Sequence, residues 1–248
     1  MVIPGSLARV ARVAQDFLKR FLFKHSLTVS QAGQDSWVFG EVFNEKKRGY
    51  FLDIGAHDGV SISNTYLLET RYQWSGICIE ANPVTFERLR RNRRAKCLNV
   101  CLDHSHGEVA FAMAGVMGGI VGLGRNAASP PGSREVEAVR MRTVPLLRVL
   151  QDHQAPRIID YLSIDVEGAE ERVLGGFDFT EFTFRCVTIE RPTARLRELF
   201  RIHGYALIKE IPNLDCFYVH RTFMKEYREN LFLFYGKKHL SLRLRYWK

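Results

Sequence analysis

Short apolar runs alternate with helix-like stretches along most of the chain, starting at residue 49. The apolar runs are rich in Ile, Val, Leu and Cys, which predicts strands. They lie at 49–54, 75–80, 96–102, 158–165 and 185–190. Between them, apolar residues recur at every third or fourth position, which predicts helices, at 82–92, 169–176 and 191–204. Strands that alternate with helices form a mostly parallel sheet covered on both faces, so we expect an α/β, Rossmann-like fold.

Two further strand-like runs follow, at 205–211 and 214–220, with turn residues between them. This spacing predicts an antiparallel hairpin that closes a mixed, seven-stranded sheet, an arrangement more typical of methyl-transfer enzymes than of dehydrogenases. The glycine-rich segment 112–134 cannot form a stable regular element, because each glycine loses much backbone entropy on ordering. We expect a mobile loop there, either a lid over the site or a surface insertion.

Both ends of the chain are basic, whereas the part between them is nearly neutral. The net charge is +9; residues 1–25 carry five basic and one acidic side chain, and residues 221–248 carry eight and two. We therefore divide the chain into a basic N-terminal helix (1–25), a central domain (26–220) and a basic, aromatic extension (221–248). A neutral central domain does not favour a nucleic-acid partner.

The basic segment 1–25 places apolar side chains at helical spacing, with most of its charges off that stripe. We expect this amphipathic helix to pack on the domain, and the alternative is an anionic membrane surface. Basic residues interrupt each of its apolar runs, so it predicts neither a signal peptide nor a membrane span. The five cysteines form no C-x-x-C pair. These features predict a cytoplasmic protein with reduced thiols, whose only membrane contact is peripheral, through the basic termini.

The first predicted strand ends at Asp53, and a turn containing Gly55, Ala56, Asp58 and Gly59 follows. Gly55 would let the backbone approach a ligand closely, and Gly59 would allow the turn into a helix. A dinucleotide pyrophosphate requires a third glycine and a helix N-terminus free of negative charge, which Asp58 does not leave. The carboxylate of Asp53 instead fits a cationic amino group, which S-adenosylmethionine has and NAD lacks.

Acidic residues also end the next two predicted strands. Glu80, followed by Ala81, ends the second, where a carboxylate accepts hydrogen bonds from ribose hydroxyls. Asp103 ends the third, in position to meet an adenine amino group, and its alternative role is to shape a turn. Carboxylates at successive strand ends lie at one edge of a parallel sheet, so we expect Asp53, Glu80 and Asp103 to surround the adenosine and amino groups of one cofactor.

Asp165 ends the fourth predicted strand, and a tight turn containing Glu167 follows. One of these two carboxylates is the best candidate to orient or deprotonate an acceptor hydroxyl, although Glu167 could instead complement the dipole of the next helix. Glu190 ends the fifth strand at the same edge. Asp165 and Glu190 could hold a divalent ion such as Mg²⁺, but oxygen-ligand sites have no fixed spacing, so we do not expect a metal.

Several of these segments together resemble the FkbM family of S-adenosylmethionine-dependent methyltransferases. They read SQAGQD (30–35), GYFLDIGAHDGVSISNTYLLE (49–69), GICIEANPVTFERLRRN (76–92) and IDYLSIDVEGAEERVLGGFDF (159–179), with TIE (188–190) after them. The resemblance extends over roughly residues 28–220. It implies a class I methyltransferase fold and methyl transfer to an oxygen, typically a hydroxyl of a sugar, glycan, glycolipid or related natural product.

The resemblance also implies roles for individual residues. Asp53, Gly55, Glu80 and Asp103 would surround the cofactor, and Asp165 and Glu167 would lie near the transferred methyl group. The SQAGQD motif would close over the cofactor or the acceptor through Gln31, Gln34 and Asp35, on the side where Glu190 ends its strand. Two other functions remain open at this point, namely methylation of RNA or DNA and a non-catalytic adaptor that keeps the fold.

Overall fold

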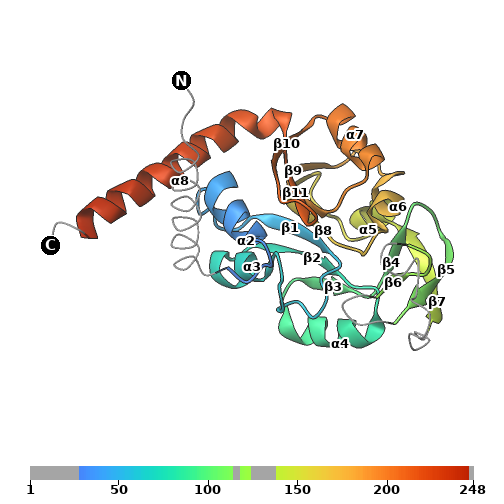
Figure 1. Ribbon diagram of the computed structural model, residues 1–248. Coiled ribbons are helices and arrows are strands. Elements are labelled where there is room, and N and C mark those ends of the chain that lie inside the picture. Colours follow the sequence, from blue (N-terminus) through green and yellow to red (C-terminus); the bar gives the residue numbers. More distant parts are fainter. Residues whose placement is uncertain (1–27, 114–117, 124–137, 246–248) are drawn as a thin grey trace, which may run out of the picture.

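The computed structural model describes residues 28–113, 118–123 and 138–245 (Figure 1). The predicted N-terminal helix at 1–25 therefore lies outside the described residues, as do 114–117 and 124–134 of the glycine-rich segment. No helix in the described part of the chain is both long enough and apolar enough to cross a membrane.

A seven-stranded sheet forms the centre of the fold and confirms the predicted class. Its strands, in spatial order, are β3 (Lys96–Leu98), β2 (Ser75–Ile79), β1 (Tyr50–Ile54), β8 (Ile158–Ile164), β9 (Thr183–Glu190), β11 (Asp215–His220) and β10 (Tyr205–Glu210). Only β11 runs antiparallel to its neighbours, β9 and β10. The predicted closing hairpin is therefore present, and the remaining pairs are parallel.

Alternating side chains of the strands point to opposite faces, and each face is buried by its own helices. In β1, Leu52 and Ile54 belong to the core beneath α5 (Leu146–Asp152), α6 (Glu170–Leu174) and α7 (Ala194–Ile202). Phe51 belongs to the opposite core, which is covered by η1 (Trp37–Val42), α3 (Tyr66–Tyr72), α4 (Pro83–Asn92) and α8 (Met224–Arg245). The apolar runs of the sequence are nearly continuous because both faces of these strands are covered.

The predicted third strand, 96–102, is wrong as a single element. It divides into β3, in the main sheet, and β4 (Cys101–Asp103), in a second sheet with β7 (Ala138–Pro145), β5 (Gly107–Ala112) and β6 (Gly119–Ile120). The division falls at Asn99, whose Nδ2 donates to the carbonyl oxygens of Glu80 and Ala81, both at 2.8 Å. This side chain thus takes backbone acceptors just past the end of β2 and directs the chain out of the main sheet.

The glycine-rich segment contains regular structure that its composition did not predict. Gly119 and Ile120 form β6 and pair with Phe111 and Ala112 at the end of β5. Ile120 is 6% exposed and packs with Phe111 in a small apolar core of the second sheet. Burial of these side chains offsets the entropy cost that the glycines impose.

The C-terminal helix α8 is attached to the domain by its first half. Tyr227 and Phe234 are buried, Asn230 Nδ2 donates to the Val42 carbonyl at 2.8 Å, and the Tyr235 hydroxyl donates to Glu41 at 2.9 Å. The Phe234 ring lies so close to Gly40 that a Cβ there would sit 2.5 Å from it. Beyond this contact, α8 extends away from the sheet (Figure 1).

A buried arginine connects the turn after β1 to α3 and α4. The side chain of Arg93, just after α4, is fully buried, and its Nε donates to Glu69 of α3 at 2.8 Å. Its terminal nitrogens donate to the Thr65 hydroxyl at 2.9 Å and to the Gly59 carbonyl at 3.2 Å, and one lies 3.9 Å from Asp53. A single guanidinium thus neutralises buried acidic charge and fixes the segment that follows β1.

Candidate active site

The carboxyl ends of β1, β2 and β8 open into one cavity, which the second sheet closes on another side. The space that its lining residues enclose, together with the solvent at its open mouth, is about 1080 Å³. The predicted site residues that line it come from four segments of the chain. They are Gln31, Gln34, Asp53, Gly55, Ala56, Glu80, Ala81, Asp165 and Glu167.

The turn after β1 has the close backbone approach that its glycines predicted, although part of the reason differs. Gly55 has φ +82°, and a Cβ there would lie 1.8 Å from the Asp165 carbonyl oxygen. The close neighbour is therefore the end of β8, in addition to any ligand in the cavity. Gly59 has φ +79°, and a Cβ there would lie 2.6 Å from the Arg93 side chain. Both positions require glycine.

Glu80 presents its carboxylate to the cavity in a fixed orientation. One oxygen accepts from the backbone N–H of His57 at 2.9 Å, and the other accepts from that of Asn82 at 2.8 Å. His57, with φ +50°, thus contributes a backbone donor that holds Glu80. Burial raises the pKa of Glu80, and the two backbone donors oppose that rise. The carboxylate keeps further lone pairs with which it can accept from ligand hydroxyls.

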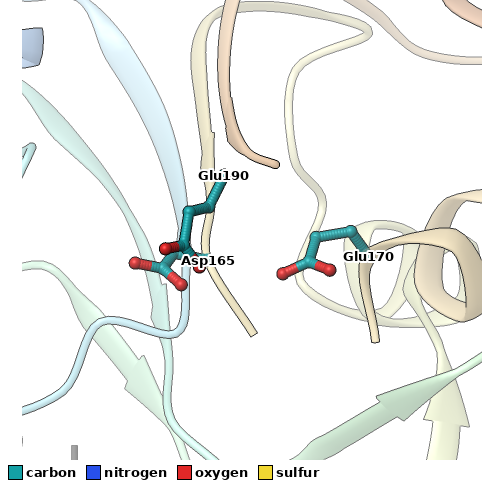
Figure 2. Close-up of side chains that lie close together, drawn as sticks. All are labelled: Asp165, Glu170 and Glu190. Atoms are coloured by element: carbon teal, nitrogen blue, oxygen red, sulfur yellow. The ribbon is translucent and has the colours of Figure 1, made fainter. Parts of the chain in front are cut away.

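Asp165 lines the β8 side of the cavity and belongs to a group of three carboxyl groups with Glu170 and Glu190, which lie behind the lining residues. One oxygen of each lies within 4.8 Å of the others (Figure 2). Asp165 follows β8, Glu190 ends β9, and Glu170 begins α6. Glu170 was not a predicted member of this group. It reaches it because its Oε1 accepts from the backbone N–H groups of Val166 and Gly168, at 3.0 and 3.2 Å.

This cluster holds more negative charge than its surroundings neutralise. Arg191 donates to Glu190 at 2.5 Å and lies 3.7 Å from Glu167. Burial, the nearby charge of Glu190 and a hydrogen bond with Glu190 raise the pKa of Asp165 to about 9. Asp165 therefore keeps a proton at neutral pH. The same oxygen atoms could accept a divalent cation, which the sequence did not lead us to expect.

Asp103 does not line the cavity, contrary to the prediction that it meets an adenine amino group. It lies at the end of β4, where Arg172 of α6 donates to both of its oxygens, one of them at 3.0 Å from Nε. The backbone N–H of His104 donates to it as well, at 2.8 Å. Its carboxylate therefore connects the second sheet to α6, while Cys101 and Leu102 of β4 reach the cavity.

The SQAGQD segment contributes two of its three predicted residues to the cavity. Gln31 and Gln34 line it, and Gln34 Nε2 donates to Asp215 at 2.6 Å. Asp35 is fully buried and lies outside it, which corrects its predicted role. Its carboxylate accepts from the backbone N–H groups of Val29 and Ser36, at 2.8 and 2.7 Å, and thereby folds the segment that places the glutamines.

The cavity also includes residues that sequence reasoning missed. Asn64 and Ser163 line it and are hydrogen-bonded to each other at 2.9 Å. Phe111 and Ile120 of the second sheet form an apolar wall. Asn64 lies in the quoted motif, so its polar side chain was a readable signal. No pattern marked the wall, because β5 and β6 are short and pair through a glycine-rich connection.

A family model for the methyltransferase FkbM domain matches residues 53–207, which is more than half of the chain. The chain belongs to the FkbM methyltransferase family. The matched range begins at Asp53 and includes Glu80, Asp165 and Glu167, so every carboxylate that lines the cavity lies within the FkbM domain, as does the neighbouring Glu190. Gln31 and Gln34 lie before it, and α8 lies after it.

Solved structures similar to the FkbM chain are distant. They include a METTL16 MTase domain (14% identity, 75% of this chain, 65% of that chain, TM-score 0.42). A second is the N-terminal domain of human METTL16 in complex with SAH, with 14% identity, 75% of this chain and 68% of that chain covered, and a TM-score of 0.41. A third is a human methyltransferase 10 domain containing protein, with 13% identity, 76% of this chain and 78% of that chain covered, and a TM-score of 0.38. The FkbM chain thus spans about two thirds of the length of the first. No curated protein sequence matches it.

We expect Asp165→Asn to lose less stability than the wild type as the pH rises. The pKa of Asp165 rises from 3.8 to about 9 on folding, so the folded state keeps a proton that the unfolded state releases. The resulting stability is complete below about pH 4 and is lost as the pH approaches about 9. The measurement is the urea midpoint across this range, with exposed Asp152→Asn as the control. Identical pH curves for Asp165→Asn and the wild type would contradict the assignment.

Proposed function

We propose that this FkbM-family methyltransferase transfers the methyl group of S-adenosylmethionine to a hydroxyl oxygen of a sugar, glycan or related natural product. The observation that carries the proposal is the division of the cavity. A fixed carboxylate, Glu80, lies at the β2 side, and Asp165, which keeps a proton and has Glu190 beside it, lies at the β8 side. The first suits a ribose, and the second suits a hydroxyl that must lose a proton.

The cavity residues fit the cofactor in shape and in hydrogen bonding. Gly55 and Glu80 both line the cavity, and Glu80 can accept from both ribose hydroxyls. Asn64 Oδ1 and Asp165 Oδ1 are buried acceptors without a hydrogen-bond partner among the described residues. Buried polar atoms are rarely left unsatisfied, so these two point to a donor-bearing ligand. S-adenosylmethionine supplies an electrophilic methyl group on a sulfonium.

The chain's own groups then have two tasks, alignment and proton acceptance. Gln31 and Gln34 line the cavity from a segment that Asp35 folds, so they can orient a polar acceptor near the cofactor. Asp165 receives the hydroxyl proton while its own proton passes to Glu190, to which it is hydrogen-bonded, and Arg191 holds Glu190 in place. Methyl transfer from a sulfonium needs no covalent intermediate with the protein.

We expect the wild-type protein to bind S-adenosylmethionine and Glu80→Ala to bind it at least about tenfold more weakly. A hydrogen bond to a charged group contributes about 1.5–3 kcal/mol, and each 1.4 kcal/mol is about tenfold in affinity. Isothermal titration calorimetry measures both. Glu87→Ala, an exposed change on α4, is the matched control and should bind like the wild type. Absence of binding by the wild type would refute the proposed function.

The acceptor class is tested by methyl transfer from labelled cofactor to separated cell fractions. We expect label in a glycan or glycolipid fraction, stable to mild base as an ether is, and a strong loss of incorporation for Glu190→Gln. Asp215→Asn, which changes the carboxylate bonded to Gln34, should have a smaller effect. Label recovered only in RNA or DNA would replace the hydroxyl acceptor of the proposal with a nucleic acid.

We further propose that α8 holds the enzyme at an anionic membrane surface, where a glycolipid acceptor would lie. Phe232 and Leu233 of α8 are 79% and 46% exposed and lie between Asn230 and Phe234, which attach the helix to the domain. Beyond Tyr235 the helix extends away from the sheet (Figure 1). The sequence 237–248 then carries five Lys or Arg residues and no acidic residue. Exposed apolar side chains next to a cationic sequence complement anionic lipid headgroups and the acyl chains beneath them.

We expect the wild type to sediment with vesicles of phosphatidylcholine and phosphatidylglycerol, and less with phosphatidylcholine alone. The double variant Phe232→Ser and Leu233→Ser should bind at least about tenfold more weakly, because burying each side chain contributes about 1.5–3 kcal/mol. Ile202→Ser, an equally exposed apolar position on α7, is the control and should bind normally. Equal binding to both vesicle types, or self-association through α8 without vesicle binding, would contradict membrane attachment.

A further inference from the structure

The β8 side of the cavity presents hydrogen-bond acceptors that have no donor. Asn64 Oδ1 and Asp165 Oδ1 are both buried and unpartnered within the described residues. Both residues line the same cavity. In the sheet, β1 with Asp53 lies between β8, which Asp165 follows, and β2, which Glu80 follows. A region lined by buried acceptors is complementary to a cationic group that carries several donors.

The orientation of the Asn64 amide follows from its neighbour Ser163. Ser163 lies beside Asp53 in the register of β8 and β1, and its hydroxyl donates to the Asp53 carboxylate, which can only accept. A hydroxyl has one proton, so Ser163 must accept from Asn64. The Asn64 Nδ2 accordingly donates to Ser163 Oγ at 2.9 Å, and the amide oxygen of Asn64 is left for another donor.

Asp53 itself has less capacity for a ligand than the sequence predicted. Its carboxylate accepts from the Thr65 hydroxyl at 2.5 Å and from Ser163, and it lies 3.9 Å from the Arg93 guanidinium. Only 4% of the residue is exposed. The amino group that the sequence assigned to Asp53 therefore has better acceptors available in Asn64 and Asp165.

We propose that Asn64, oriented by Ser163, binds the α-amino group of the cofactor's methionine moiety together with Asp165. The inference rests on the proposed function and names the residues that read this end of the cofactor. The order of the strands supports it, because β2 and β8 flank β1 on opposite sides. A cofactor whose ribose lies at Glu80 and which crosses β1 brings its amino acid end to Asn64 and Asp165. Asn64 thus distinguishes a complete cofactor from one without the amino acid.

The test compares two ligands that share the adenosine and sulfur but differ in the amino acid. S-adenosylhomocysteine has the α-amino group, and 5′-methylthioadenosine lacks it. We expect Asn64→Ala to weaken S-adenosylhomocysteine binding by about tenfold or more and to change 5′-methylthioadenosine binding less than about twofold, by calorimetry. Ser163→Ala should show the same selectivity to a smaller degree, and it carries the test if Asn64→Ala does not fold.

The matched control is Asn92→Ala, which removes an exposed amide bonded to the Asp58 carbonyl. It should bind both ligands as the wild type does. Unchanged S-adenosylhomocysteine binding by both Asn64→Ala and Ser163→Ala, or an equal loss for the two ligands, would overturn the inference and leave the proposed function intact. Wild-type protein that binds neither ligand would overturn both.

Discussion

The buried ion pair between Arg93 and Glu69 is the interaction on which the cofactor side of the cavity depends. The guanidinium also donates to Thr65 and lies near Asp53, so α3, the end of α4 and the turn after β1 share one charged group. Two carboxylates in this interior would be strongly unfavourable without it. The same arginine closes the space beside Gly59. The hydrogen bonds and charge of Arg93 thus hold the turn after β1 in place from the core side, without any contribution from a ligand.

The opposite side of the cavity follows a different electrostatic rule. Asp165, Glu170 and Glu190 gather at the ends of β8 and β9 with Arg191 as a partial counter-charge. A surplus of carboxyl groups in a half-buried place retains protons, which is costly for stability at high pH and useful for proton transfer. The fold therefore has two groups of acids near the turn after β1. Asp53 and Glu69 are neutralised by Arg93, whereas the carboxyl groups around Asp165 are only partly neutralised by Arg191.

Sequence patterns predicted the main sheet well because its strands are nearly continuous apolar runs, and they located Asp53, Glu80, Asp165 and Glu190 because strand ends share one edge. They failed where a residue distant in sequence decides the outcome. Asp103 forms an ion pair with Arg172, 69 positions away. The carboxylate of Asp35 accepts hydrogen bonds from the backbone of its own segment. The sequence places Glu170 only in the first turn of a helix, where an acidic residue is common. In the structure the backbone N–H of Val166 donates to its carboxylate, which brings it close to Asp165. The second sheet needed long-range pairing of β5 with β7, which no local period indicates.

The contact between Gly55 and the Asp165 carbonyl oxygen has a consequence for changing this enzyme's substrate range. The turn after β1 and the end of β8 pack so closely that a Cβ at Gly55 would lie 1.8 Å from the Asp165 carbonyl oxygen, so a side chain at residue 55 would displace one of them. Variation that preserves chemistry must then come from surfaces that lie outside this contact. The apolar wall of Phe111 and Ile120, carried by a separate small sheet, is such a surface. One part of the cavity is thus fixed by tightly packed backbone, and another part consists of side chains carried by a separate sheet.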